Sequence, residues 1–173
     1  MSEVVEATQT THQRQDHQAP QQIVPQRTGD YLEVMSKAIF QTGISWKVVE
    51  NKWPGIHDAF RGFDHRRVAS LTEAEMADLG ADPRVIRNRR KIVAIVDNAR
   101  TMLDLEEQHG SFQNYLRSHS DFEATVADLR KRFKFLGEMG CFYFLYVVGE
   151  EVPSYEDWCS SRGREHHGAP SHA

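Results

Sequence analysis

The strongest constraint on the fold is a long stretch of helical periodicity, residues 83–108, in which apolar side chains recur every three or four positions. Asp82 is a suitable N-cap residue for this helix, and a glycine follows its far end. A shorter helix over residues 71–80 precedes it, where the spacing of Thr72 and Glu75 predicts a capping box. A short helix, a tight connection and a long helix are therefore expected to follow one another directly.

The other apolar segments of the chain repeat the helical period. Residues 141–148 have strand propensity, but their apolar positions do not follow a period of two, so we assign them to a helix. The sequence therefore predicts an all-α protein. The further helices are expected at residues 30–41, 45–53 (ending near Pro54), 112–118, 121–133, 138–148 and 153–161.

The two ends of the chain differ from its middle. Residues 1–27 are rich in Gln, Thr, His and Pro, contain no Phe, Tyr or Trp and show no apolar period, and residues 163–173 are similar. Such segments bury too little apolar surface to offset the entropy of ordering. We therefore expect one folded domain over residues 28–162 between two disordered tails, which suits a chain of 173 residues.

Composition excludes several classes of protein. No apolar run approaches the length of a bilayer, and the amino terminus lacks the apolar core of a secretory signal, so we expect a cytoplasmic monomer with no membrane role. Cys141 and Cys159 form no CxxC pair, which argues against a disulfide framework and a cysteine-rich metal site. The formal net charge of −4 does not exclude nucleic acid, because binding depends on the local field.

Basic side chains are concentrated in two places. A helix amino terminus presents free N–H groups and partial positive charge, so cations added there favour phosphate binding, as in a helix-hairpin-helix that grips the DNA backbone. The alternative is a solvated basic face, and the two clusters could share one groove or be unrelated patches. The first comprises Arg84, Arg87, Arg89, Arg90 and Lys91, and the second comprises Arg130, Lys131, Arg132 and Lys134.

The junction "QTGISW", residues 41–46, joins two predicted helices. An enzyme that modifies a base must extrude the nucleotide, fill the gap with an apolar wedge and hold the base against an aromatic face. Gly43, Ile44 and Trp46 supply these parts in order. The alternative is that Trp46 is a core anchor at the start of a helix.

Three segments in this order, "QTGISW", "FDHRRVASLTEAEMADLGADPRVIRNRRKIVAIVDNARTM" and "RFKFLGEMGCFYFLYVVG", resemble the DNA-3-methyladenine glycosylase I family of the helix-hairpin-helix glycosylase superfamily. The resemblance covers roughly residues 31–150. It implies an all-α fold with a base pocket between helices and DNA across the hairpin. It further implies that Gln41, Gly43 and Ile44 form the intercalating loop and that Trp46 is the pocket aromatic.

The sequence departs from this family at two features. The resemblance implies a glutamate that contacts the base where this chain has Ala38, and a zinc clip whose cysteine ligands are missing here. We therefore expect no metal and no cofactor. Glu138, which begins a predicted helix after the second basic cluster, could supply the missing charge as the catalytic acid, although it could equally complement the helix dipole.

These features favour a monofunctional N-glycosylase that removes alkylated purines, such as 3-methyladenine, from double-stranded DNA. Backbone contacts are expected from Arg84, Arg87, Arg89, Arg90, Lys91, Lys131 and Lys134, and base contacts from Trp46 and the position of Ala38. A catalytically degenerate DNA-binding or lesion-sensing protein of the same fold is one alternative. A helical interaction domain without a DNA role is another.

Overall fold

The structure is a computed structural model that describes residues 19–166, with side chains to residue 162. Throughout this range the regular elements are helices, which confirms the predicted all-α class. The elements are α1 (Thr28–Gln41), α2 (Trp46–Ala59), the 3-10 turn η1 (Arg61–Phe63), α3 (His65–Ala69), α4 (Glu73–Ala81), α5 (Arg89–His109), α6 (Phe112–Leu116), α7 (Phe122–Arg132), α8 (Glu138–Val147) and α9 (Tyr155–His166).

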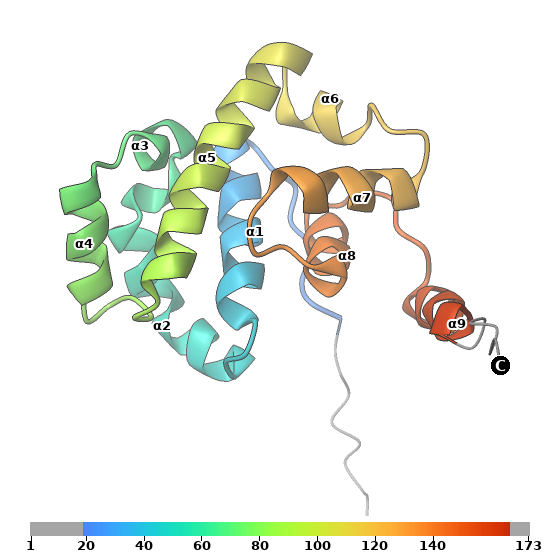
Figure 1. The fold of residues 1–173 in the computed structure, drawn as a ribbon, viewed down its shortest axis with the longest axis horizontal. Helices are drawn as coiled ribbons and strands as arrows, with labels where there is room; N and C mark the ends of the chain where they lie inside the picture. The colour runs from blue at the N-terminus through green and yellow to red at the C-terminus, as the bar shows by residue number, and fades with distance from the viewer. Residues whose placement is uncertain (1–18, 167–173) are drawn as a thin grey trace, which may run out of the picture.

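Helices α1 and α5 form the centre of the molecule (Figure 1). Helices α2, α3 and α4 lie on one side of this pair and α6, α7 and α8 on the other, while α9 projects at the far edge (Figure 1). The two central helices contribute many of the fully buried side chains, including Leu32, Ile39, Ile92 and Ile95. One continuous apolar core therefore fixes the helix ends that carry the candidate site.

The long helix begins six residues later than its sequence predicts, at Arg89 rather than Pro83. The Asp82 carboxylate caps a turn instead, accepting the backbone N–H of Arg84 at 2.8 Å and pairing with its guanidinium. Asn88 is the N-cap of α5, because its Oδ1 accepts the backbone N–H of Lys91. The connection between α4 and α5 is therefore an open loop, and Val85 anchors it in the core.

The second helix runs through Pro54 to Ala59, beyond its expected end. Val49 and Ile56 are fully buried on either side of the proline, so tertiary packing outweighs the hydrogen bond that proline cannot donate. The short elements η1 and α3 were not predicted. Asp64 caps α3 by accepting the backbone N–H groups of Arg66 and Arg67.

Part of the expected amino-terminal tail packs on the domain. Ile23 donates its N–H to the Val147 carbonyl at 2.8 Å, and the Gln22 side chain donates to the Tyr146 carbonyl. The segment over residues 19–27 thus follows the end of α8, whereas composition placed it outside the fold. The remaining tail expectations, for residues 1–18 and 167–173, lie outside the described residues.

Candidate nucleic-acid interface

The wedge loop, residues 42–45, joins α1 to α2 at one end of the molecule. Gly43 has a φ of 79°, in the left-handed region that favours glycine, and open space surrounds the position that a Cβ would occupy. Backbone bonds from Thr42 to Ile39 and from Ile44 to Gln41 close the turn. The loop is thus a tight corner with its glycine facing outward.

The apolar side chains of this corner differ in exposure. Trp46 is 67% exposed at the first position of α2, so within this structure it is not a core anchor. Ile44 is half-buried and packs against the core. Ala38, by contrast, is 7% exposed and lies within the core.

Lys91 connects the wedge loop to the start of α5. Its side chain is buried, and its ammonium donates a 2.7 Å hydrogen bond to the Thr42 carbonyl. Burial lowers the pKa of this ammonium. The place of Lys91 in the basic cluster predicted a contact with the DNA backbone, but its side chain points inward, where it holds the carbonyl at the end of α1.

The remaining cations divide into two groups. Arg84 pairs with Asp82 and Lys134 pairs with Asp97, at 2.8 Å and 2.6 Å. The second group comprises Arg87, Arg89, Arg90 and Lys131, which are exposed. No carboxylate of the described residues lies within ion-pair distance of these four side chains. Unpaired cations at a helix start favour binding to an anionic partner.

A groove of about 410 Å³ lies beside the start of α5. The two basic clusters contribute jointly to it, because Arg89, Arg90 and Lys134 line it together with Phe135. Phe135 is 51% exposed and has a φ of 59°, which is rare for a bulky residue. The buried Asn98 side chain fixes this turn through two hydrogen bonds with the Lys134 backbone. Lys131, at the end of α7, does not line the groove.

The position of Glu138 differs from its expected role. Its carboxylate pairs with Arg130 at 3.0 Å and with Arg162 at 2.7 Å. Tyr143, the α8 residue whose pKa the Gln41 side chain affects, is five residues further along α8, which corresponds to about 140° around the helix. Glu138 therefore lies in the contact of α8 with α7 and α9 and does not face the wedge loop.

A row of polar and aromatic side chains follows the α1–α2 seam, which sequence reasoning missed. Glu33 accepts from the Trp53 indole and contacts His57, both at 3.0 Å. One turn further along α1, the Lys37 ammonium lies 5.5 Å from the Trp53 ring centre and 2.5 Å from the Glu50 carboxylate. The signal was the three- and four-residue spacing of these side chains on each helix, which places them on one face.

The seam continues to the wedge loop through Tyr143. Burial raises the pKa of the Tyr143 phenol, the Glu50 carboxylate raises it further, and a hydrogen bond with Gln41 opposes these effects. Gln41, Glu50 and Tyr143 are therefore close neighbours, although they come from three helices. Trp46 lies one turn before Glu50 on α2.

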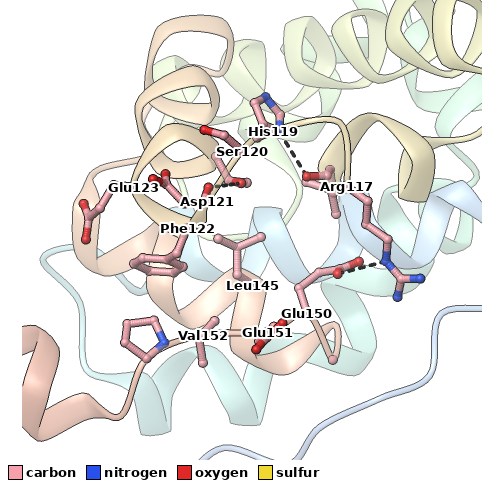
Figure 2. A pocket seen from close by; sticks show the side chains of 14 residues that line it. Arg117, His119, Ser120, Asp121, Phe122, Glu123, Leu145, Glu150, Glu151 and Val152 are labelled. Carbon is pink, nitrogen blue, oxygen red and sulfur yellow. Dashed lines mark hydrogen bonds and ion pairs between the residues drawn. The ribbon is translucent and has the colours of Figure 1, made fainter.

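A larger cavity of about 820 Å³ lies elsewhere, between the α6–α7 connection and the segment after α8 (Figure 2). Figure 2 shows the carboxylates of Glu150 and Glu151 at one side of it and those of Asp121 and Glu123 at the other. Its residues contribute more acidic than basic side chains. A polyanion would be repelled there, so volume alone does not identify a DNA site.

The described residues contain no group of three or more His, Cys, Asp or Glu side chains arranged to hold a metal ion. The absence of zinc stays a prediction, because His12, His17, His167 and His172 lie outside the described part of the chain. Within residues 19–166, no helix combines the length and apolarity that a membrane span requires.

Comparisons with known proteins point in one direction. The family described as methyladenine glycosylase matches residues 23–134. DNA-3-methyladenine glycosylase 1 of Escherichia coli (strain K12) is 30% identical over 130 residues, which cover 63% of this chain and 70% of that protein. DNA-3-methyladenine glycosylase of Haemophilus influenzae is 28% identical over 130 residues, with the same shares covered.

Solved structures agree with the sequence comparisons. A variant of 3-methyladenine DNA glycosylase I in complex with 3-methyladenine has a TM-score of 0.66 and 26% identity, covering 78% of this chain and 83% of that chain. A solution structure of 3-methyladenine DNA glycosylase I has a TM-score of 0.61 and 30% identity, covering 73% and 79%.

Proposed function

Since this chain belongs to the methyladenine glycosylase family, we propose that it hydrolyses the N-glycosidic bond of alkylated purines, such as 3-methyladenine, in duplex DNA. The observation that carries the proposal is the family match across the wedge loop and the basic connection before α5, which carries Arg84 and Arg87. The exposed indole of Trp46 beside that loop supports it. The protein acts as a monomer on one damaged base at a time.

The wedge loop opens the base stack. Ile44 is carried on a tight turn, with Gly43 at its outermost point, so the loop can approach the duplex closely. The extruded base stacks on Trp46, whose ring attracts an electron-poor purine by about 0.5–2 kcal/mol. Gln41 ends α1 beside the same space and borders the vacated stack.

The chemical step needs little from the protein. Alkylation at N3 makes adenine cationic, and the base departs with the electron pair of its bond to C1′, becoming neutral. Water supplies the hydroxyl group to C1′ and releases one proton. The protein therefore contributes extrusion of the base, stacking and access for water. The small side chain of Ala38 is compatible with this role, because none of these contributions needs a carboxylate at that position.

The phosphates are held by Arg87, Arg89 and Arg90, at and before the first turn of α5, which have no carboxylate partner among the described residues. Arg84, Lys131 and Lys134 flank this surface and add to its field. Such contacts position the duplex without reading its sequence, so affinity falls as salt rises. Lys91 acts differently, by fixing the loop that carries the wedge.

The decisive experiment incubates the protein with methylated genomic DNA and separates the released bases by chromatography. We expect free 3-methyladenine in amounts that increase with protein and time. Salt-dependent duplex binding without any released base would instead support a degenerate lesion-sensing protein. Absence of both would leave only a helical interaction domain.

A further inference from the structure

The α1–α2 seam ends beside Trp46 in a charged cluster. Trp46 and Glu50 are one turn apart on α2, and Lys37 and Gln41 are one turn apart on α1, so each pair projects from one helix face. The Lys37 ammonium lies 2.5 Å from Oε1 of Glu50. This pair ties the two helices together next to the exposed indole.

The charges of the seam do not cancel. Glu33 and Glu50 each carry one negative formal charge and Lys37 carries one positive charge, so the three together carry −1. Oε2 of Glu50 accepts no hydrogen bond from the described residues, whereas Oε1 is engaged by Lys37. The side chain of Glu50 is 46% exposed, so a ligand on Trp46 can reach that free oxygen.

We propose that Glu50 is the carboxylate that receives the positive charge of an alkylated purine stacked on Trp46, and that Lys37 holds Glu50 in position. This inference rests on the proposed function and names the substrate-recognising acid of the same site. A charge-assisted hydrogen bond from the exocyclic amine of the base to Oε2 favours the cationic purine over the unmodified one.

The other acids considered for this role, Glu33 and Glu138, form contacts away from Trp46. Glu33 accepts from Trp53 and contacts His57 deeper in the seam, away from the wedge loop. Glu138 pairs with two arginines on another side of α8. Glu50 is thus the acid that combines a free oxygen with a place one turn from Trp46.

The chemistry of the reaction indicates that Glu50 selects the cationic base and does not accelerate breakage of its bond to C1′. The base loses its positive charge as the bond to C1′ breaks, so a carboxylate near the base stabilises the bound cation more than the departing neutral base. Replacing Glu50 should therefore weaken binding of the damaged duplex and raise KM, with a smaller effect on kcat.

The test uses a duplex that contains 7-methylguanine, a cationic base, protected from loss by a 2′-fluoro substituent, and the same duplex with guanine. Fluorescence anisotropy gives the preference of the full chain for the cationic duplex. We expect the preference of the wild type to exceed that of Glu50→Gln about tenfold, because the variant keeps only the preference that stacking on Trp46 provides. In assays of base release, Glu50→Gln should raise KM about tenfold and change kcat less than threefold.

The matched control is Glu75→Gln. Glu75 is also a partly exposed glutamate in an ion pair, with Arg61 at 2.7 Å, but it belongs to α4. Glutamine is equally suited to its capping box, so the variant should behave as the wild type. Thermal melts of both variants check that each remains folded.

The outcomes separate this inference from the proposed function. A wild type that prefers the cationic duplex through Glu50 but releases no base would retain the inference and overturn the glycosylase. Base release with an unchanged preference and KM in Glu50→Gln would overturn the inference and retain the glycosylase. Loss of the preference in Glu138→Gln instead of Glu50→Gln would also overturn it.

Discussion

Two hollows in the protein surface carry opposite charge. The groove beside α5 measures about 410 Å³ and is lined by Arg89, Arg90 and Lys134, with Asp97 as the acid among its lining residues. The cavity between the α6–α7 connection and the end of α8 measures about 820 Å³ and is lined by four carboxylates, those of Asp121, Glu123, Glu150 and Glu151. The smaller hollow is the one that suits a polyanion, because the sign of the field outweighs the volume.

The two regions also differ in how their charges are satisfied. Near the larger cavity, Asp128 accepts hydrogen bonds from Tyr115 and Arg132 and contacts His119, while Arg117 pairs with Glu150. These contacts hold α6 and α7 in place. The arginines at the start of α5 have no such partners among residues 19–162. Paired charges thus stabilise the fold on one side, and unpaired charges are free for a ligand on the other.

The largest effect is expected from Trp46→Ala, beside the wedge loop. Base stacking on an aromatic side chain contributes about 1–3 kcal/mol, so release of 3-methyladenine should fall about tenfold to hundredfold. Affinity for undamaged duplex should stay nearly constant, because the indole contacts the base and not the backbone. Base chromatography and anisotropy measure the two quantities. A cooperative melt lost in this variant would show that the exposed indole is needed for folding.

The contrast in charge between the groove and the larger cavity is tested by removing arginines beside each of them. Arg89→Ala with Arg90→Ala should weaken duplex binding about tenfold and reduce the slope of log affinity against log salt by about 0.9 for each lost phosphate contact. Arg117→Ala, beside the acidic cavity, is the control and should leave the slope unchanged. Equal slopes for the double variant and the wild type would mean that the groove does not bind DNA.

A smaller effect is expected from Lys91→Met. The change removes the bond to the Thr42 carbonyl, at a cost of about 1–3 kcal/mol, and loosens the wedge loop. Base release should fall several-fold while the salt slope remains that of the wild type. A slope lower by about one unit would show that Lys91 reaches a phosphate, as its sequence position suggested.

The smallest effect on DNA, and a measurable one on stability, is expected from Asp128→Asn. Burial raises the pKa of Asp128, but hydrogen bonds from Tyr115, His119 and Arg132 outweigh it and lower the pKa from 3.8 to about 2. A lowered carboxyl pKa contributes stability above about pH 4 that is lost as the pH falls toward 2. The wild type should therefore lose stability across this window in denaturant titrations, and the variant should lose less. Parallel curves would show that Asp128 does not control the acid response.

The start of α5 shows where sequence reasoning about this chain fails. Asp82 and Pro83 suit a helix start, yet the Asp82 carboxylate binds Arg84 instead, and Asn88 is the N-cap of α5. Both capping arrangements are locally reasonable. The burial of Val85 in the core selects between them, and burial depends on packing that a single segment does not contain.

The candidate site divides in the same way. The position of Trp46 at a helix start, the turn at Gly43 and the run of arginines before α5 follow from local patterns that the sequence displays. The exposure of Trp46 does not follow from them. The direction of a long side chain does not follow from such patterns, because it depends on which helix lies opposite. Lys91 therefore turned inward and Glu138 turned toward two arginines, against expectation.

The sequence by itself determined the helical class, the order of the helices other than α3, the turn at Gly43 and the run of basic residues before α5, because caps, turns and the period of apolar side chains are local properties. Only the tertiary structure decided which charges meet. Lys37 and Glu50 are 13 positions apart in the chain and join only because α1 and α2 pack side by side. Tyr143 reaches Gln41 from α8 for the same reason: burial of one shared core fixes distances between residues that the chain itself leaves independent.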